Sequence, residues 1–568
     1  MTVKRISFVF LVLLTGALYQ AGAQTITAAS CNASDVQTAF NAVVNTTTTV
    51  IIPAGTCAWT TAVSLTVPSG SSTITIQGAT TVAGSGDPAS NNLSVTDNTI
   101  IVDNNASNNS LLTINANTSP SLIRLTGMTF EGGSGADKYH GIIVVNGSTT
   151  NFRFDHSHIN TSTYSPSNSS DGIGISGCIY GVVDHTLFDN IAGAVNNMLP
   201  ETNAGSCFGD PLGDGDQSWH NATSLGSSSF MYAEQNVFNS GAANDCTQGG
   251  RFVFRFNTFN ATSPEPTVQT HPTGGAGRHR GCRAWEIYGN AFNADASNYI
   301  NAGFWVSSGT GVVWGNKIPA SSAGGGTGYK NFIQMQSMRQ NNGTYSQTVP
   351  PGGWGYCGTD FNGTGSNWDQ NSNAASGYHC LDQPGMGVGD LLTGGFSSDG
   401  SGSNNVCDIT QNPSGCSSYT GQWVNEAVEP IYEWMDAFSP VPSNPSALLG
   451  VNSTFGNTPN FVANTDYYLW CNASSQTGCT SFTGATGVGN GALASAPSTC
   501  TQGVGYFATD QGSWNQSGNG FGNGVLYRCG PSSSFASFYT PYTYPHPLES
   551  STPTLAPPTQ TPPNVVVH

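Results

Sequence analysis

The chain has 568 residues, of which only 8% are charged, and its formal net charge is −18. This charged fraction is about a third of the usual ~25%. A phosphate backbone requires a basic surface, so the composition argues against a nucleic-acid-binding protein. It also argues against a coiled coil or a helical bundle, because Asn, Thr, Ser, Gly and aromatic residues dominate. With 27 Phe, 20 Tyr and 11 Trp, the chain can fill a large core.

The first residues have the pattern of an export signal. Lys4 and Arg5 precede an apolar run over residues 6–18, and Ala21 and Ala23 form a small-x-small cleavage site. The run is too short for a comfortable membrane span, and no later segment is long and apolar enough for one. The sequence therefore predicts a secreted protein, with a signal peptide at residues 1–23 and cleavage after Ala23.

The 14 cysteines all follow the predicted signal, and their even number indicates disulfides formed in an oxidising compartment. No CxxC pair is present, which disfavours a zinc ribbon. Short separations suggest four pairs: Cys31 with Cys57, Cys357 with Cys380, Cys407 with Cys416, and Cys471 with Cys479.

A repeat decides the predicted architecture. Seven segments share a short strand, an Asn-type turn and a large apolar residue, and they end at Phe130, Ile159, Phe188, Phe238, Phe259, Phe292 and Ile318. Most successive spacings match the ~20 to 30 residues of one β-solenoid turn, and the longer two indicate turns with insertions.

Stacked turns would place equivalent residues in columns about 4.8 Å apart. Asparagines stand two residues before the terminal apolar position and directly after it, which predicts stacked amide ladders. Five residues before that position is an apolar column expected to point inward: Leu125, Phe154, Val183, Ala233, Phe254, Ile287 and Val313.

This pattern resembles the right-handed parallel β-helix of the pectin lyase-like superfamily over residues 25–340. The segment from Ser30 to Trp59 is similar to the superfamily's N-terminal capping helix and first strands, and phrases at His140 and Asp171 are also similar to it. The resemblance implies an all-β chain with a parallel β-helix at 24–340. Residues 341–548 are expected to form a loop-rich extension with a small β cap, and residues 549–568 a Pro/Thr-rich tail.

The residue after each inward position is expected to face outward. This second column reads Thr126, Asp155, Asp184, Glu234, Arg255, Tyr288 and Trp314. Three acids on consecutive turns would repel unless a cation lies among them, so Asp155, Asp184 and Glu234 are predicted to bind calcium. The segment around Asp155 is similar to the WIDH segment of pectate lyases, which are Ca²⁺-dependent. A transition metal on His156, His158 and His185 and a solvated polar face are the alternatives.

Arginines form the second anomaly, because five of them lie within 33 residues of an acidic chain: Arg251, Arg255, Arg278, Arg280 and Arg283. A local basic patch would attract a uronate carboxylate or a sulfate. By analogy with arginine bases in lyases, Arg280 or Arg283 is predicted as the base, with His271 as an alternative. Arg251, Arg255 and Arg278 are predicted to bind substrate. The alternative is that these arginines pair with structural carboxylates.

Two long insertions, at 190–228 and 261–283, leave successive turns at the same point of the repeat. They would form a groove walled by Trp219, Tyr288 and Trp314, whose rings suit sugar faces.

The sequence therefore predicts a secreted lyase acting on an acidic, uronic acid-containing polysaccharide. One alternative is a glycoside hydrolase using Asp184 or Asp155 together with Glu234. The other is a non-catalytic glycan-binding protein or adhesin, in which the acids and arginines do not share one cleft.

Overall fold

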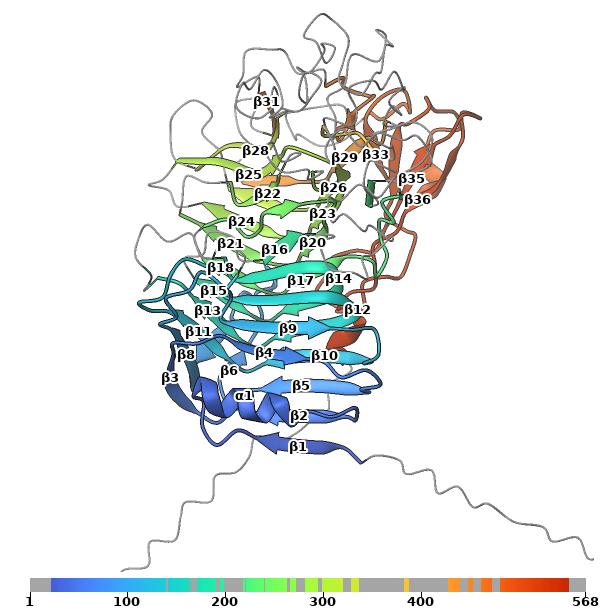
Figure 1. Ribbon diagram of the computed structural model, residues 1–568. Helices are drawn as coiled ribbons and strands as arrows, with labels where there is room; N and C mark the ends of the chain where they lie inside the picture. Colours follow the sequence, from blue (N-terminus) through green and yellow to red (C-terminus); the bar gives the residue numbers. More distant parts are fainter. Residues whose placement is uncertain are drawn as a thin grey trace, which may run out of the picture.

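The computed structural model of the chain is a tall stack of parallel strands with a smaller sheet at its side (Figure 1). It describes residues 22–138, 141–162, 164, 171–189, 195–198, 218–219, 221–239, 241–262, 266–271, 281–294, 299–319, 328–336, 383–387, 428–439, 448–452, 461–471 and 481–550. Most of the predicted signal peptide, and the tail after residue 550, lie outside these ranges.

Two parallel sheets contain most of the strands. The larger has 20 strands: β1 (Gln24–Thr27), β2 (Thr48–Ile51), β4 (Val63–Thr66), β5 (Thr73–Gln77), β9 (Leu112–Ala116), β10 (Leu122–Thr126), β12 (Ile143–Asp155), β14 (Ile173–Asp184), β16 (Val195–Met198), β17 (Met231–Glu234), β19 (Cys246–Thr247), β20 (Arg251–Arg255), β22 (Val268–Thr270), β23 (Ala284–Tyr288), β25 (Tyr299–Val306), β26 (Thr310–Trp314), β28 (Gly328–Gln336), β29 (Ile431–Trp434), β31 (Leu449–Asn452) and β32 (Tyr467–Tyr468). The second has 10 strands: β3 (Gly55–Trp59), β8 (Thr99–Asp103), β11 (Thr129–Gly132), β13 (His158–Asn160), β15 (Leu187–Asp189), β18 (Val237–Asn239), β21 (Thr258–Ala261), β24 (Ala291–Ala294), β27 (Lys317–Pro319) and β30 (Ala437–Ser439).

The larger sheet consists of two ladders joined by the long strands β12 and β14. We call ladder 1 the series β1–β2–β5–β10–β12–β14–β17–β20–β23–β26–β29–β32. Ladder 2 is β4–β9–β12–β14–β16–β19–β22–β25–β28–β31. The ten-stranded sheet is ladder 3. The chain is thus all-β with long parallel sheets, which is consistent with the predicted solenoid.

The predicted columns are in register. The inward column runs through ladder 1 from Leu125 to Val313 with every member buried. In ladder 3 the terminal aromatics stack, and the ring centroids of Phe238 and Phe259 are 5.0 Å apart. Consecutive side chains along a strand point to opposite faces, which explains why the two columns lie side by side in the sequence and on opposite faces of the sheet.

The buried asparagine ladder also forms. The side-chain nitrogens of Asn236, Asn257 and Asn290 each donate to the amide oxygen of the next asparagine, at 3.1, 3.0 and 3.0 Å. Asn316 ends the ladder by donating to Asp436 at 2.8 Å. Each buried side-chain amide of the ladder is therefore hydrogen-bonded to its neighbour in the turn between ladders 1 and 3.

Each coil bends sharply at the residue that follows the outward column. At this position the backbone φ is positive for Gly127, His156, His185, Gln235, Phe256, Gly289, Gly315 and Met435. Non-glycine residues pay roughly 1–2 kcal/mol for this conformation, so the repeated pairing on either side must hold it.

A helix, α1 (Ala33–Asn41), lies within the segment that the sequence compared to a capping helix, and it buries Val36, Ala39 and Phe40. The predicted Cys31–Cys57 disulfide forms, and two unpredicted ones join Cys246 to Cys282 and Cys500 to Cys529. The other three predicted pairs lie wholly or partly outside the described residues.

The sequence suggested that the parallel coils end near residue 340, but parallel strand pairing continues beyond it. β29, β30 and β31 pair with β26, β27 and β28, and β32 pairs with β29. The intervening residues, mostly outside the described ranges, therefore form an insertion between coils, which hides the repeat in the sequence.

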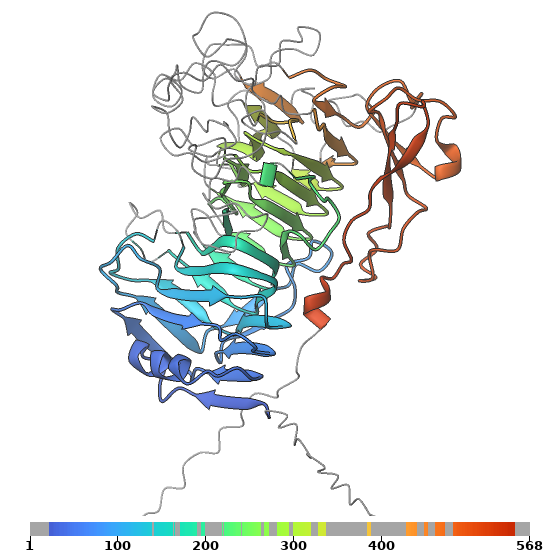
Figure 2. The same cartoon turned by 45° about the vertical axis from the view of Figure 1, so that its right-hand side comes forward.

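The C-terminal part packs along the side of the stack. Its sheet comprises β33 (Val488–Gly491), β34 (Gly505–Ala508), β35 (Val525–Cys529) and β36 (Phe535–Tyr539), with antiparallel β34–β35–β36 pairing as the hairpin-like sequence suggested. The chain then descends beside ladder 1 to the short helix α3 (Pro547–Ser550) next to β12 (Figure 2). A two-stranded hairpin, β6 (Thr81–Ala83) with β7 (Ser94–Thr96), and the 3-10 turn η2 (Leu493–Ser495) complete the described elements.

Candidate functional site

The outward column lies on one face of ladder 1, as the sequence predicted. Strand pairing aligns Thr126, Asp155, Asp184, Glu234, Arg255, Tyr288 and Trp314 on successive coils. The column is buried, and its three acids are 0% exposed. Its members therefore meet, but beneath the surface.

Arginines neutralise the three acids. Arg124 binds both carboxylate oxygens of Asp155, and Arg153 binds both of Asp184 at 2.9 and 2.8 Å. Nε of Arg255 donates to Glu234 at 2.5 Å.

These ion pairs decide the charge of the acids. Burial alone would raise the pKa of Asp155 and of Asp184. Hydrogen bonds and charge from the neighbouring guanidinium groups outweigh burial and hold both values below their ordinary range. Arg255 does the same for Glu234.

The calcium prediction for Asp155, Asp184 and Glu234 assumed that these acids repel one another unless a cation lies among them. In the structure, guanidinium groups supply that positive charge. The carboxylate oxygens point at these donors instead of converging on an open position. Sequence reasoning missed Arg124 and Arg153, although each stands two residues before a column member and strand alternation puts it on the same face.

The C-terminal segment covers the column. Arg255 donates to the carbonyl oxygens of Tyr542 and Thr543, at 2.7 and 2.9 Å. Arg153 donates to those of Leu548 and Glu549, at 3.2 and 3.1 Å. Residues about 290 to 400 positions away thus occupy the face predicted to hold a substrate, as the red chain beside the coils shows (Figure 2).

A carboxyl pair lies where this segment meets the column. The backbone nitrogen of His546 donates to Glu234 at 2.6 Å, and the side chain of Glu549 shares a hydrogen bond with Glu234. Burial, together with the charges of Glu234 and Asp184, raises the pKa of Glu549 well above its ordinary value. Docking of this segment therefore favours protonation of Glu549.

Two histidines stack at the turn that follows the column. The rings of His156 and His185 are 4.9 Å apart and nearly parallel, at 10°. Their Nδ1 atoms contact Asp155 and Asp184 at 2.7 and 2.9 Å. Asp184 raises the pKa of His185 against the opposing effect of burial.

Among the described residues, His156, Asp184 and His185 are the one group of His, Cys, Asp and Glu close enough to hold a metal ion, with ligand atoms within 4.8 Å. Parallel rings do not converge on one ion, and the Asp184 oxygens already bind Arg153. His158 does not join this group. It lies in ladder 3 between Asp97 and Asp189, at 3.1 and 3.0 Å.

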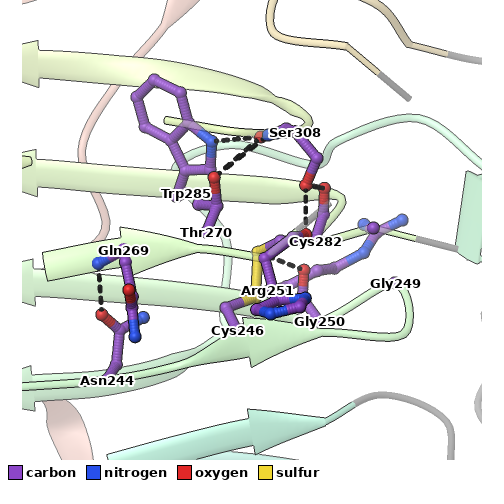
Figure 3. Close-up of a disulfide and its surroundings, with 12 residues drawn as sticks. Asn244, Cys246, Gly249, Gly250, Arg251, Gln269, Thr270, Cys282, Trp285 and Ser308 are labelled. Carbon is purple, nitrogen blue, oxygen red and sulfur yellow. Dashed lines mark hydrogen bonds between the residues drawn. A yellow bond between two sulfur atoms is a disulfide. The ribbon is translucent and has the colours of Figure 1, made fainter. Parts of the chain in front are cut away.

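The predicted arginine cluster is divided between the two ends of the ladder 1 strands. Arg251 begins β20 and Arg255 ends it, so they are separated by four residues, or about 13 Å of strand. Figure 3 shows Arg251 near the Cys246–Cys282 disulfide. Arg251 and Arg283 therefore do not share one groove with the three acids. Arg278 and Arg280 lie outside the described residues.

Arg251 and Arg283 are fully enclosed. Arg251 donates to the carbonyl oxygens of Ser218, Ala222 and Thr223. Burial and the charge of Arg283 lower the pKa of Arg251 to about 10. Arg283 pairs with Glu429 at 2.9 Å.

His271 follows β22 near this end, and its carbonyl oxygen accepts hydrogen bonds from Cys282 and Ser308. These contacts fit the structural alternative, in which the arginines hold an insertion.

The predicted sugar-stacking aromatics are core residues. Trp219 donates from Nε1 to the carbonyl oxygen of Gly281 at 2.9 Å. Tyr288 stacks on Trp314 at 4.8 Å, and Trp314 contacts Phe507 of the C-terminal sheet at 5.1 Å. All three residues are at most 1% exposed, so they pack inside the protein instead of forming the predicted groove wall for sugar faces.

No described helix is long and apolar enough to cross a membrane. Comparison with known proteins gives no relative: no protein-family model, no curated protein and no solved structure matches this chain.

Proposed function

We propose that the chain is an exported parallel β-helix protein that binds an extracellular polysaccharide without cleaving it. One observation carries the choice of binding over cleavage. Among the described arginines of the predicted cluster, Arg251 is about 13 Å along β20 from Arg255, and the three acids are already paired with Arg124, Arg153 and Arg255 under the C-terminal segment. The resemblance to the pectin lyase-like superfamily supports a polysaccharide as the ligand, as an analogy of fold.

Export is part of the same proposal. Lys4, Arg5 and the apolar run after them have the pattern expected of an export signal, and three disulfides among the described residues are compatible with an oxidising compartment.

A lyase is the second candidate, because the resemblance to the pectin lyase-like superfamily supports it as an analogy of fold. In such a reaction the base would remove the proton beside a uronate carboxylate, and the leaving sugar would depart to give an unsaturated product.

The two candidates are separated by incubating the purified protein with a panel of acidic and neutral polysaccharides. Retention without products is expected. An unsaturated product that is lost in Arg280→Lys would establish the lyase, and new reducing ends without unsaturation would establish a hydrolase. Absence of both retention and products on every polysaccharide would refute binding and cleavage alike.

A further inference from the structure

A cleft lies at the junction between the last coils and the C-terminal sheet, away from the covered column. Its volume is about 450 Å³, within the range of ligand-binding clefts. Tyr432 of β29, Tyr468 of β32 and Arg528 of β35 line it. Asn464, Thr465 and Gln502 add amide and hydroxyl groups.

Arg528 gives the cleft its charge. It is the one charged side chain among the described residues that line the cleft, and it has no carboxylate within ion-pair distance in the described part of the chain. Its guanidinium lies over the ring of Phe538, 4.1 Å from the centroid, and bonds to Tyr432. Every other arginine described above donates to a carboxylate or to backbone carbonyls. Arg528 differs because its guanidinium N–H groups border the open cleft.

Two acids neighbour lining residues in the sequence, but neither lines the cleft. Asp466, next to Thr465, is 0% exposed and accepts a hydrogen bond from the backbone nitrogen of Val462 at 2.7 Å. Glu429 stands between two lining residues, Val428 and Pro430, but its carboxylate binds Arg283. In a chain of net charge −18, this leaves a local positive site. A guanidinium fork matches a carboxylate or a sulfate through two parallel hydrogen bonds.

The walls of the cleft are held in place. The Cys500–Cys529 disulfide fixes the residue next to Arg528, and β35 pairs with β34 at Gly505. Tyr432 stacks on Tyr468 at 5.2 Å, and their hydroxyls donate to the carbonyls of Gly503 and Gln502. Binding would therefore require little ordering of the protein, which favours affinity.

We propose that this cleft binds a small anionic sugar, with Arg528 pairing with its carboxylate or sulfate and the surrounding amide and hydroxyl groups contacting its hydroxyls. The proposal rests on the proposed function and adds the class of sugar and its location. It differs from the sequence-based hypothesis, which assigned substrate binding to Arg251 and Arg255, both buried, and to Arg278, which lies outside the described residues.

The test is isothermal titration of the full secreted chain with digalacturonate, with a sulfated disaccharide, and with the digalacturonate whose carboxyls are reduced to alcohols. One or both anionic sugars should bind, and the reduced sugar should bind at least tenfold more weakly. Arg528→Gln should lower the affinity tenfold or more, as expected for losing a charged hydrogen-bonded pair. Arg528→Lys, which keeps the charge but loses the fork, should be intermediate. Preference for the carboxylated or the sulfated sugar identifies the anion.

Lys317→Gln is the matched control, because it removes one positive charge from an exposed residue outside this cleft. Equal binding by Arg528→Gln and the parent chain, or equal binding of the reduced sugar, would overturn the proposal. If Arg528→Gln loses the disaccharide while no polysaccharide is retained by the parent chain, the site stands and the proposed function fails. If polysaccharide is retained equally by both chains, the function stands and this site is wrong.

Discussion

The pair formed by Arg255 and Glu234 should show how strongly the covered column is held. Both side chains are 0% exposed. Arg255 also donates to the hydroxyl of Tyr288 at 3.1 Å and to two carbonyls of the C-terminal segment. Arg255→Met would leave the Glu234 carboxylate buried without its main partner, which costs about 3–5 kcal/mol of unfolding free energy. The loss is measured from the midpoint of urea unfolding followed by tryptophan fluorescence.

The double variant Arg255→Met/Glu234→Leu is the decisive comparison. Removing both charges abolishes the unpaired ion, so most of the loss should be recovered even though neither wild-type partner is present. Lys317→Met serves as the control, because this exposed residue should change stability by less than about 0.5 kcal/mol. A loss under about 1 kcal/mol in Arg255→Met, or a double variant less stable than the single one, would refute the interpretation of the pair as a buried, neutralised contact.

Two further predictions concern the ladders and the C-terminal segment. Asn257→Ala removes five side-chain hydrogen bonds from the buried ladder and should destabilise the protein by about 3 kcal/mol, whereas Asn293→Ala, in the exposed ladder, should cost about 0.5 kcal/mol. Equal losses of unfolding free energy in urea would contradict a role for burial. Because the folded-state pKa of Glu549 is raised, its stabilising contribution is complete below pH 4.5 and is lost as the pH rises through the raised value. Proteolysis of the C-terminal segment should accelerate as the pH rises through this range in the parent chain but not in Glu549→Gln. If the variant shows the same acceleration as the parent chain, Glu549 is not the cause.

The stacked columns could be predicted because they depend only on local rules. Strand alternation and the spacing between Phe130 and Ile318 determine which residues meet on successive coils. The inward column, the asparagine ladder and the alignment of Asp155 with Asp184 all follow from these rules, and the structure has each of them.

The environment of the outward column could not be predicted in the same way. Its burial depends on residues 542–549, which are some 290 positions beyond Arg255 and carry no periodic signal. The role of Arg153 could have been inferred from alternation, but its second set of partners, at Leu548 and Glu549, could not. A column of acids looks the same in the sequence whether its counter-charge is a metal ion or a guanidinium group.

The descent of the C-terminal segment beside the coils has a consequence for how the molecule unfolds. In a solenoid each coil touches only its neighbours, so unravelling can begin at an end and spread. Here one continuous stretch is bonded to Arg153 of β12, Glu234 of β17, Arg255 of β20 and Glu286 of β23. These coils cannot unfold one at a time while these hydrogen bonds remain. We therefore expect the middle of the stack to unfold as one cooperative unit.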